Sequence, residues 1–256
     1  MALLQTTNVV KRFGGLTAVN KMNLVFEKGQ IASIIGPNGA GKTTFFNTLT
    51  GIYTPEEGEI VFNGRTLIGL RPDQIAERGI ARTFQNIRLF GNLPVIENVK
   101  VALQSQMRHS LVGTLLSANS FLQRERELET RAAECLDLVG LTVQPDRLAR
   151  SLPYGDQRKL EIARAIAIKP QLLLLDEPTA GMNPSEAGEV LRLIRRLRDE
   201  LKITIMLVAH DIPMVMNLCE QIQVLNYGKL IAEGDPGAVR NNAEVIAAYL
   251  GQAKDA

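Results

Sequence analysis

The stretch that decides the fold is GPNGAGKT, residues 36–43. It fits the pattern G-x-x-x-x-G-K-[ST], which chance produces in roughly one chain in a hundred of this length. The glycines let the backbone curl so that successive N–H groups point at phosphate oxygens. Lys42 can then reach the β- and γ-phosphates of a nucleotide, and the Thr43 hydroxyl can bind Mg²⁺. The stretch therefore predicts a site for a nucleoside triphosphate with magnesium.

The flanking residues place this loop between a strand and a helix. The run IASII at 31–35 is typical of a buried strand, and TTFFNTL at 43–49 is typical of a helix. That helix would present its positive end to the same anion. A dinucleotide-binding G-x-G-x-x-G loop is not supported, because the lysine–threonine pair points to a triphosphate. The predicted nucleotide contacts are Gly36, Pro37, Asn38, Gly39, Ala40, Gly41, Lys42, Thr43 and Thr44.

Composition limits the other classes of function. The chain has 256 residues, which suffices for one large α/β domain or two small lobes. With 5% aromatic residues, no tryptophan and a net charge of +2, a nucleic-acid surface is poorly supported. Cys135 and Cys219 lack metal-ligand spacing, which favours buried thiols in a reducing compartment. We see no signal-peptide layout and no apolar run long enough to span a bilayer, so we expect any membrane to be met through a partner.

Short apolar strands alternate with helices in the second half of the chain, which predicts a largely parallel sheet covered on both faces. Asn63-Gly64 and Tyr227-Gly228 mark two hairpins. Asn183 is the predicted cap of the helix that follows it. The region 92–150 is mostly helical in pattern, and its apolar stretch 108–120 fits equally a loop packed on its own helices or a partner contact. His109, inside that stretch, is assigned no role.

Two carboxylates follow the apolar run LLLL at 172–175. In an open parallel sheet, ligands bind outside the carboxyl ends of the strands. Asp176 suits magnesium, through a water, and Glu177 suits a base for the attacking water. His210 ends another such run and has two interpretations. It can hold backbone groups at a strand-to-helix corner, or it can contact the γ-phosphate and the attacking water.

In this order, these motifs resemble those of the ATP-binding cassette (ABC) ATPases, and the resemblance covers nearly the whole chain. It rests on KRFGG at 11–15, the phosphate loop, TFQN at 83–86, the octet SLPYGDQR at 151–158, LLLLDEPTAGMNP at 172–184 and VAHD at 208–211. In that family two cassettes pack head to tail. Each ATP is held between one subunit's phosphate loop and the other's signature sequence, usually Leu-Ser-Gly-Gly-Gln.

The resemblance implies a role for individual residues. Phe13 matches the aromatic residue on which adenine stacks. Gln85 matches a glutamine that senses magnesium, and with Thr43 and Asp176 it forms the implied metal site. Glu177 and His210 match the catalytic glutamate and the switch histidine, and Gln85 is the third catalytic candidate. The implied contacts to the other subunit's ATP are Leu152, Tyr154, Gly155, Asp156 and, in the loop that crosses the dimer interface, Asn183.

The octet departs from the family pattern. Pro153 stands where the family usually has serine, which removes one hydroxyl contact to the γ-phosphate and one backbone N–H. Asp156 suits the dipole at a helix start but brings negative charge towards a nucleotide. What remains is Gly155 and the N-terminus of the helix QRKLEIARAIA. Asn183 replaces the usual aspartate, and Ala209 precedes the histidine where bulkier polar residues are frequent.

The implied architecture is α/β: a P-loop ATPase core with a mostly parallel sheet, an N-terminal antiparallel β-subdomain and a helical subdomain. We expect the core to span 1–91 and 161–256, and the helical subdomain, which receives a transporter's coupling helices, to span 92–160. Together they form a single cassette.

Several stretches look like the ATPase subunits of branched-chain amino acid importers. They are RFGGLTAVN at 12–20, GIARTFQNIRLFGNLPVIENV at 79–99, YGDQRKLEIARA at 154–165, the length of the segment at about 104–130, and the tail AEGDPGAVRNNAEVIAAYLG at 232–251. The implied partners are a second ABC ATPase subunit, identical or not, two integral membrane permease subunits and, indirectly, a periplasmic substrate-binding protein, with no nucleic acid. The implied location is peripheral, on the cytoplasmic face of the bacterial inner membrane.

Other cargoes stay open, because this chain does not read the transported molecule. Importers for urea or other amides share much of the pattern, and a lipopolysaccharide-export ATPase has a similar tail. A soluble ABC ATPase that acts on DNA or ribosomes is a poorer match. Such proteins usually carry two cassettes or long coiled-coil insertions, whereas this chain has one cassette and no sustained heptads.

Overall fold

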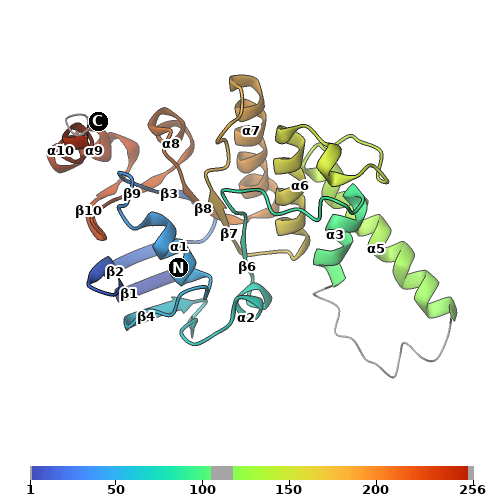
Figure 1. Ribbon diagram of the computed structural model, residues 1–256, viewed down its shortest axis with the longest axis horizontal. Helices are drawn as coiled ribbons and strands as arrows, with labels where there is room; N and C mark the ends of the chain where they lie inside the picture. The colour runs from blue at the N-terminus through green and yellow to red at the C-terminus, as the bar shows by residue number, and fades with distance from the viewer. Residues whose placement is uncertain (1, 105–117, 253–256) are drawn as a thin grey trace. The chain divides into compact units, whose positions relative to one another are not determined.

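The computed structural model describes residues 2–104 and 118–252 (Figure 1). His109 and most of the apolar stretch 108–120 lie outside these residues. The chain divides into two compact units. The first unit comprises Met1–Arg82, Gln171–Pro178 and Ile194–Ala256, and the second comprises Thr83–Pro170 and Thr179–Leu193. Among the described residues, no helix has the length and apolar character needed to cross a membrane.

The larger sheet of the first unit has six strands in the order β10-β9-β3-β8-β7-β6. Neighbouring strands are parallel except for β10, which pairs antiparallel with β9. The strands are β3 (Ile31–Ile35), β6 (Ile80–Arg82), β7 (Leu172–Asp176), β8 (Thr204–Val208), β9 (Gln221–Asn226) and β10 (Lys229–Gly234). Every residue of β3, β7 and β8 is buried, as expected for central strands of a covered parallel sheet. The predicted parallel sheet is confirmed.

The second sheet is antiparallel, with the order β2-β1-β4-β5. Its strands are β1 (Ala2–Phe13), β2 (Leu16–Glu27), β4 (Glu57–Phe62) and β5 (Arg65–Thr66). The predicted hairpin between β4 and β5 is confirmed: Asn63 and Gly64 both have positive φ, 49° and 72°. Two such residues give the turn whose twist matches that of paired strands.

Helix α1 (Lys42–Leu49) packs in a hydrophobic core with residues of both sheets. Its buried side chains Phe45, Phe46 and Leu49 belong to one cluster with strand residues such as Leu4 and Met206. Figure 1 shows this helix directly after β3, so the phosphate loop is held at both ends. The other helices of the first unit are α2 (Pro72–Glu77), α8 (Ile212–Leu218), α9 (Pro236–Arg240) and α10 (Ala243–Gln252).

The second unit is mainly helical. It contains α3 (Val95–Gln104), α5 (Ala118–Leu138), the short 3₁₀ turn η1 (Ala149–Ser151) and α6 (Tyr154–Ala167), and α7 (Pro184–Leu201) starts in it. Helices α3, α5 and α6 pack against one another. Asn98, fully buried in α3, bonds the backbone of Phe90 in both directions, at 2.9 and 3.1 Å. The unit covers a wider range than the segment 92–160 predicted as the helical subdomain.

The starts of two helices bear on the sequence interpretation. The cap of α7 is confirmed: Asn183 Oδ1 accepts from the N–H groups of Ser185 and Glu186, both at 3.0 Å. Helix α6 starts three residues earlier than predicted, at Tyr154 rather than at the QRKLEIARAIA segment. Pro153 lies at the N-cap with φ −55°, close to the helical value. Residues 154–158 of the octet therefore belong to α6, Ser151 ends η1, and Leu152 and Pro153 lie between these two elements.

Candidate nucleotide-binding and hydrolysis site

The phosphate loop joins β3 to α1, and its glycines are required by close packing. A Cβ on Gly36 would lie 2.1 Å from the carbonyl oxygen of Leu225. A Cβ on Gly41, whose φ is +99°, would lie 2.2 Å from the carbonyl oxygen of Ala18. Both distances are far below contact, so neither position accepts a side chain without moving backbone. The curled loop is thus fixed by its neighbours as well as by its own sequence.

Lys42 is buried at the first position of α1 and points back into the loop. Its ammonium Nζ donates to the carbonyl oxygens of Gly36 at 2.7 Å and Pro37 at 2.8 Å. Burial lowers the pKa of Lys42, while the charges of Glu177 and Asp176 oppose that shift. A buried cation encircled by a glycine loop at a helix N-terminus fits a polyphosphate ligand.

Two contacts support the loop from elsewhere in the first unit. In the turn between β9 and β10, the Gly228 N–H donates to the Ala40 carbonyl at 2.9 Å, and Asn20 N–H donates to the Gly228 carbonyl at 2.8 Å. In α10, burial raises the pKa of Tyr249 to about 12, and a hydrogen bond with the Gly36 backbone opposes the rise. Sequence reasoning found neither contact, because they join segments about 190 or more residues apart.

The predicted catalytic pair comes together at the end of the sheet. Glu177 follows β7, and its N–H donates to the Val208 carbonyl of β8 at 2.8 Å. His210 Nε2 lies 2.9 Å from Glu177 Oε1. The cap of the next helix is Asp211, which accepts from Met214 N–H. Asp211 therefore caps this helix, and the His210 side chain contacts the Glu177 carboxylate.

Glu177 also has an unusual backbone conformation. Its φ is +47°, in the left-handed region that glutamate rarely adopts. This conformation is compatible with the backbone bond to Val208, which fixes the residue beside β8. Strain of this kind persists only where the surroundings determine the backbone, and it is common at active sites.

Arg82 is a residue of the site that sequence reasoning missed. It ends the three-residue strand β6, and its Nη2 lies 3.0 Å from Asp176 Oδ2, with only 5% of either side chain exposed. Arg82 Nη1 also donates to Asn47 Oδ1 at 2.7 Å and Thr50 Oγ1 at 3.2 Å. The available signal was a cation at the end of a strand beside an acid-ended strand, but β6 is too short for its pattern to be read.

Phe13 lies at the end of β1 and is 42% exposed. Its ring meets Tyr53 edge-on, with centroids 5.1 Å apart, and Lys11 Nζ lies 5.3 Å from its centroid. An exposed ring in this setting offers a face on which a flat base can stack.

The predicted residues that act on a second nucleotide all belong to the second unit. Leu152 and Gly155 are buried, whereas Tyr154 is 42% exposed. A Cβ on Gly155 would lie 3.4 Å from Glu186 Oε1, so the first turn of α6 lies beside α7. Asp156 is in that first turn, 3.8 Å from the ammonium of Lys159. Asn183 and Gln85, both exposed, belong to the same unit.

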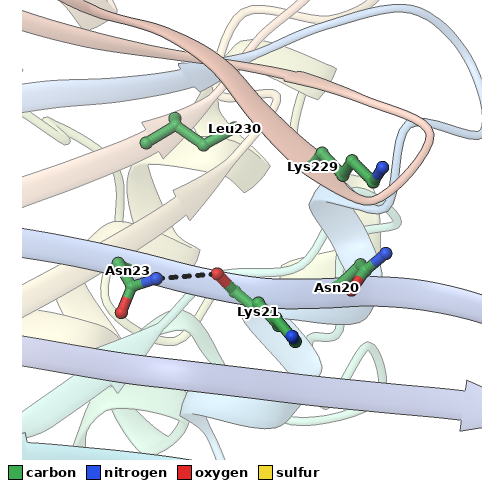
Figure 2. A pocket seen from close by; sticks show the side chains of 5 residues that line it. All are labelled: Asn20, Lys21, Asn23, Lys229 and Leu230. Carbon is green, nitrogen blue, oxygen red and sulfur yellow. Dashed lines mark hydrogen bonds between the residues drawn. The ribbon is translucent and has the colours of Figure 1, made fainter.

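The first unit also has a surface hollow of about 510 Å³ between β2 and β10. Figure 2 shows its five lining side chains and the bond from Asn23 Nδ2 to the Lys21 carbonyl, 2.8 Å long. Lys21 and Lys229 are exposed, and no residue of the phosphate loop lines the hollow.

A glycine loop around a buried lysine, with a strand-end carboxylate pair and a histidine beside it, defines a P-loop ATPase core. The ABC transporter family model matches residues 19–180. A second model, for branched-chain amino acid ATP-binding cassette transporters, matches residues 229–255. The chain belongs to the ABC transporter family and is an ATP-binding cassette ATPase.

The similarity to curated relatives extends over almost the whole chain. The high-affinity branched-chain amino acid transport ATP-binding protein LivG of Escherichia coli is 47% identical over 251 residues, which cover 98% of each chain. The corresponding protein BraF of Pseudomonas aeruginosa is 45% identical with the same coverage.

Solved structures agree with the fold. The ADP conformation of MJ1267, an ATP-binding cassette of an ABC transporter, has a TM-score of 0.85 at 29% identity, over 98% of this chain and 99% of that one. The dimeric post-hydrolysis state of the cassette MJ0796, bound to ADP and Pi, has a TM-score of 0.77 at 28% identity, over 91% and 98%. The predicted fold class is thereby confirmed.

Proposed function

We propose that this chain is the ATP-hydrolysing subunit of an importer for branched-chain or related amino acids. The observation that supports ATP hydrolysis is the contact of Glu177 with His210, together with the charge of Glu177 near Lys42 of the phosphate loop. The cargo is supported by the match of residues 229–255 and by the names of the relatives. In this proposal the cassette works with a second ATPase subunit, two membrane permeases and, indirectly, a periplasmic binding protein. It lies at the cytoplasmic face of the bacterial inner membrane.

The first unit binds the ATP that the cassette itself hydrolyses. Backbone N–H groups of 36–44 and the positive end of α1 bind the phosphates, and adenine stacks on Phe13. The ammonium of Lys42 exchanges its two carbonyl partners for β- and γ-phosphate oxygens, which are stronger acceptors. This exchange needs little movement, because the lysine already points into the loop.

Glu177 accepts a proton from the attacking water as the new bond to the γ-phosphorus forms and the bond to the β–γ bridging oxygen breaks, giving ADP and phosphate. His210 holds the Glu177 carboxylate through its Nε2 and orients it toward that water. The left-handed backbone of Glu177 aims the carboxylate from a fixed position at the sheet edge.

The donor set also fits magnesium. Hydroxyl and carboxylate oxygens are the hard ligands that Mg²⁺ prefers, and we assign this role to Thr43 and Asp176 of the first unit. For Gln85, in the second unit, the same role is proposed from the family resemblance alone. When bound, the ion neutralises charge on the β- and γ-phosphates. Arg82, by holding one oxygen of Asp176, orients that carboxylate.

The second unit acts on the ATP of the other subunit. Gly155 and the first turn of α6 present backbone N–H groups and a positive helix end, and Asn183 lies in the loop proposed to cross the interface. The dimeric solved structure of MJ0796 supports this pairing by analogy. Pro153 and Asp156 leave this half of the site with fewer donors than the usual signature. The helices of 92–160 form the proposed contact with the membrane subunits.

The test has a biochemical and a transport arm. Glu177→Gln should abolish hydrolysis while leaving ATP binding, so that ATP traps a closed dimer; retention of most wild-type turnover would remove Glu177 from its role. The assembled complex, purified gently from membranes, should drive ATP-dependent uptake of labelled leucine into vesicles. Uptake of urea but not of leucine would mean that the transported molecule is an amide and not a branched-chain amino acid. Absence of membrane subunits from the preparation would contradict the importer assignment.

A further inference from the structure

Arg158 is the last residue of the octet and lies one turn into α6, where it is fully buried. Its guanidinium donates to two successive backbone carbonyls of the segment that carries the predicted glutamine. Nη1 lies 2.7 Å from the Phe84 carbonyl oxygen, and Nη2 lies 2.9 Å from that of Gln85. One planar side chain of α6 thus grips both carbonyls, a geometry that lysine cannot reproduce.

Glu161, on the next turn of the same helix, holds the same segment by its N–H groups. Its Oε1 accepts from the backbone N–H of Phe84 at 3.3 Å and of Arg88 at 3.4 Å, while its Oε2 pairs with Arg158 at 2.7 Å. Burial raises the pKa of Glu161, and Arg158 and the two N–H groups oppose that rise. The segment 84–88 is therefore attached to α6 by donors and acceptors together.

Tyr154 extends these contacts to the octet and to the loop that precedes α7. Its hydroxyl lies 3.5 Å from Arg158 Nη2, and a Cβ on Gly181 would lie 3.6 Å from its ring. Tyr154 occupies a position where the usual signature has glycine. In this chain the exposed Tyr154 ring lies beside Gly181, so Tyr154 contacts both Arg158 and the 180–183 loop.

A buried ion pair of this kind is weak evidence for stability, because desolvation offsets most of its attraction. Two hydrophobic residues of similar volume often stabilise a fold as well or better. What hydrophobic residues cannot do is bind backbone carbonyls and N–H groups of a loop. What the Arg158–Glu161 pair provides, and a hydrophobic pair would not, is a fixed position of segment 84–88 relative to the octet.

We propose that Arg158 and Glu161 are positioning residues that lock Gln85 to the octet, so that the two move as one body. This inference rests on the proposed function, in which Gln85 serves the cassette's own ATP and the octet serves the ATP of the other subunit. The lock would then transmit the state of one nucleotide site to the other, as a coupling between two sites.

The test uses hydrogen–deuterium exchange of the full-length chain with a Glu177→Gln background to prevent turnover. The key variant is Arg158→Met with Glu161→Leu, which removes the lock and leaves a hydrophobic pair that keeps the fold. Arg158→Lys is the conservative variant, which keeps the charge but not the two-carbonyl grip. Lys100→Met is the matched control, because Lys100 is another buried cation of the second unit. It pairs with Glu97 and Glu125, neither of which belongs to 84–88 or to the octet.

Without ATP, we expect amides 84–88 to exchange about tenfold faster in the double variant, as expected for the loss of a hydrogen bond to a charged acceptor. With ATP and Mg²⁺, amides 84–88 and 152–158 should gain protection in parallel in the Glu177→Gln parent. In the double variant, the gain of one segment should no longer follow the gain of the other. The Mg²⁺ dependence of ATP affinity, measured by calorimetry, should weaken in the double variant and partly recover in Arg158→Lys. Lys100→Met should change neither exchange at 84–88 nor the Mg²⁺ dependence.

The proposal is overturned if the folded double variant exchanges at 84–88 like the parent, if the two segments still gain protection together, or if Lys100→Met gives the same changes. Should the double variant not fold, Arg158→Lys decides by the same criteria. None of these measurements depends on the transported cargo or on turnover, so their failure is distinct from failure of the importer assignment.

Discussion

The buried pair of Arg82 and Asp176 gives the sharpest prediction for stability. Replacing Arg82 by methionine keeps most of its volume but leaves the Asp176 carboxylate buried without this partner. Breaking one side of a buried pair costs about 3–5 kcal/mol. Arg82 also donates to Asn47 and Thr50 and stacks over Phe46 at 5.6 Å, so the upper part of this range applies. We expect a melting temperature lower by about 10 °C or more.

The chain provides its own control for this prediction. Arg71 and Asp73 form an arginine–aspartate pair of similar length, 2.8 Å against 3.0 Å, but their side chains are 70% and 60% exposed. Since exposed pairs contribute little, Arg71→Met should unfold in urea almost like the wild type. Arg82→Lys should fall between the wild type and Arg82→Met, because a lysine keeps the charge but not the fork of donors. A loss of less than about 1 kcal/mol in Arg82→Met would refute the reasoning, which rests on burial as the source of the cost.

Three further predictions concern the loop, the adenine contact and a thiol. Gly41→Ala should lower ATP affinity at least about tenfold in a binding titration, because its Cβ would collide with the Ala18 carbonyl; wild-type affinity would contradict the packing argument. Phe13→Ala should raise the Michaelis constant for ATP more than it lowers kcat, and the opposite pattern would exclude stacking. Burial raises the pKa of Cys219 to about 12 from 9.0, so the folded chain keeps a proton that the unfolded chain loses. The contribution of the Cys219 proton to stability is complete below pH 9 and is lost as the pH rises towards 12. The free energy of unfolding should therefore fall less between pH 8.5 and 10.5 in Cys219→Ala than in the wild type. Equal falls in the two proteins would count against this assignment.

Local pattern predicted the parts of the fold that are long or strongly punctuated. The strands 31–35, 172–176 and 204–208 are fully buried, and their apolar runs are sufficient to identify them. The hairpin at Asn63-Gly64 and the cap at Asn183 follow from side-chain and backbone chemistry within a few residues. The phosphate loop and its neighbouring elements belong to the same class, because the motif carries its own context.

What sequence could not show depends on contacts between distant segments. Strand β6 has three residues and exists by pairing with β7, so neither it nor the Arg82 contact to Asp176 is visible in a local pattern. Helix α6 starts directly after Pro153 at its N-cap, whereas the sequence alone marks this proline by the hydroxyl and the N–H that it lacks. The role of Tyr154 beside Gly181 could not be read either, because it requires α6 and the 180–183 loop to be adjacent.

The positive φ of Glu177 has a consequence for how this protein can change over time. Glycine or asparagine would relieve the backbone at this position, so a screen that rewards only heat resistance would enrich them there. The same substitutions remove the carboxylate that we propose as the base. Selection for thermal stability therefore favours glycine or asparagine at position 177, whereas selection for ATP turnover favours glutamate. Libraries aimed at a more durable transporter should hold residue 177 constant and seek gains elsewhere.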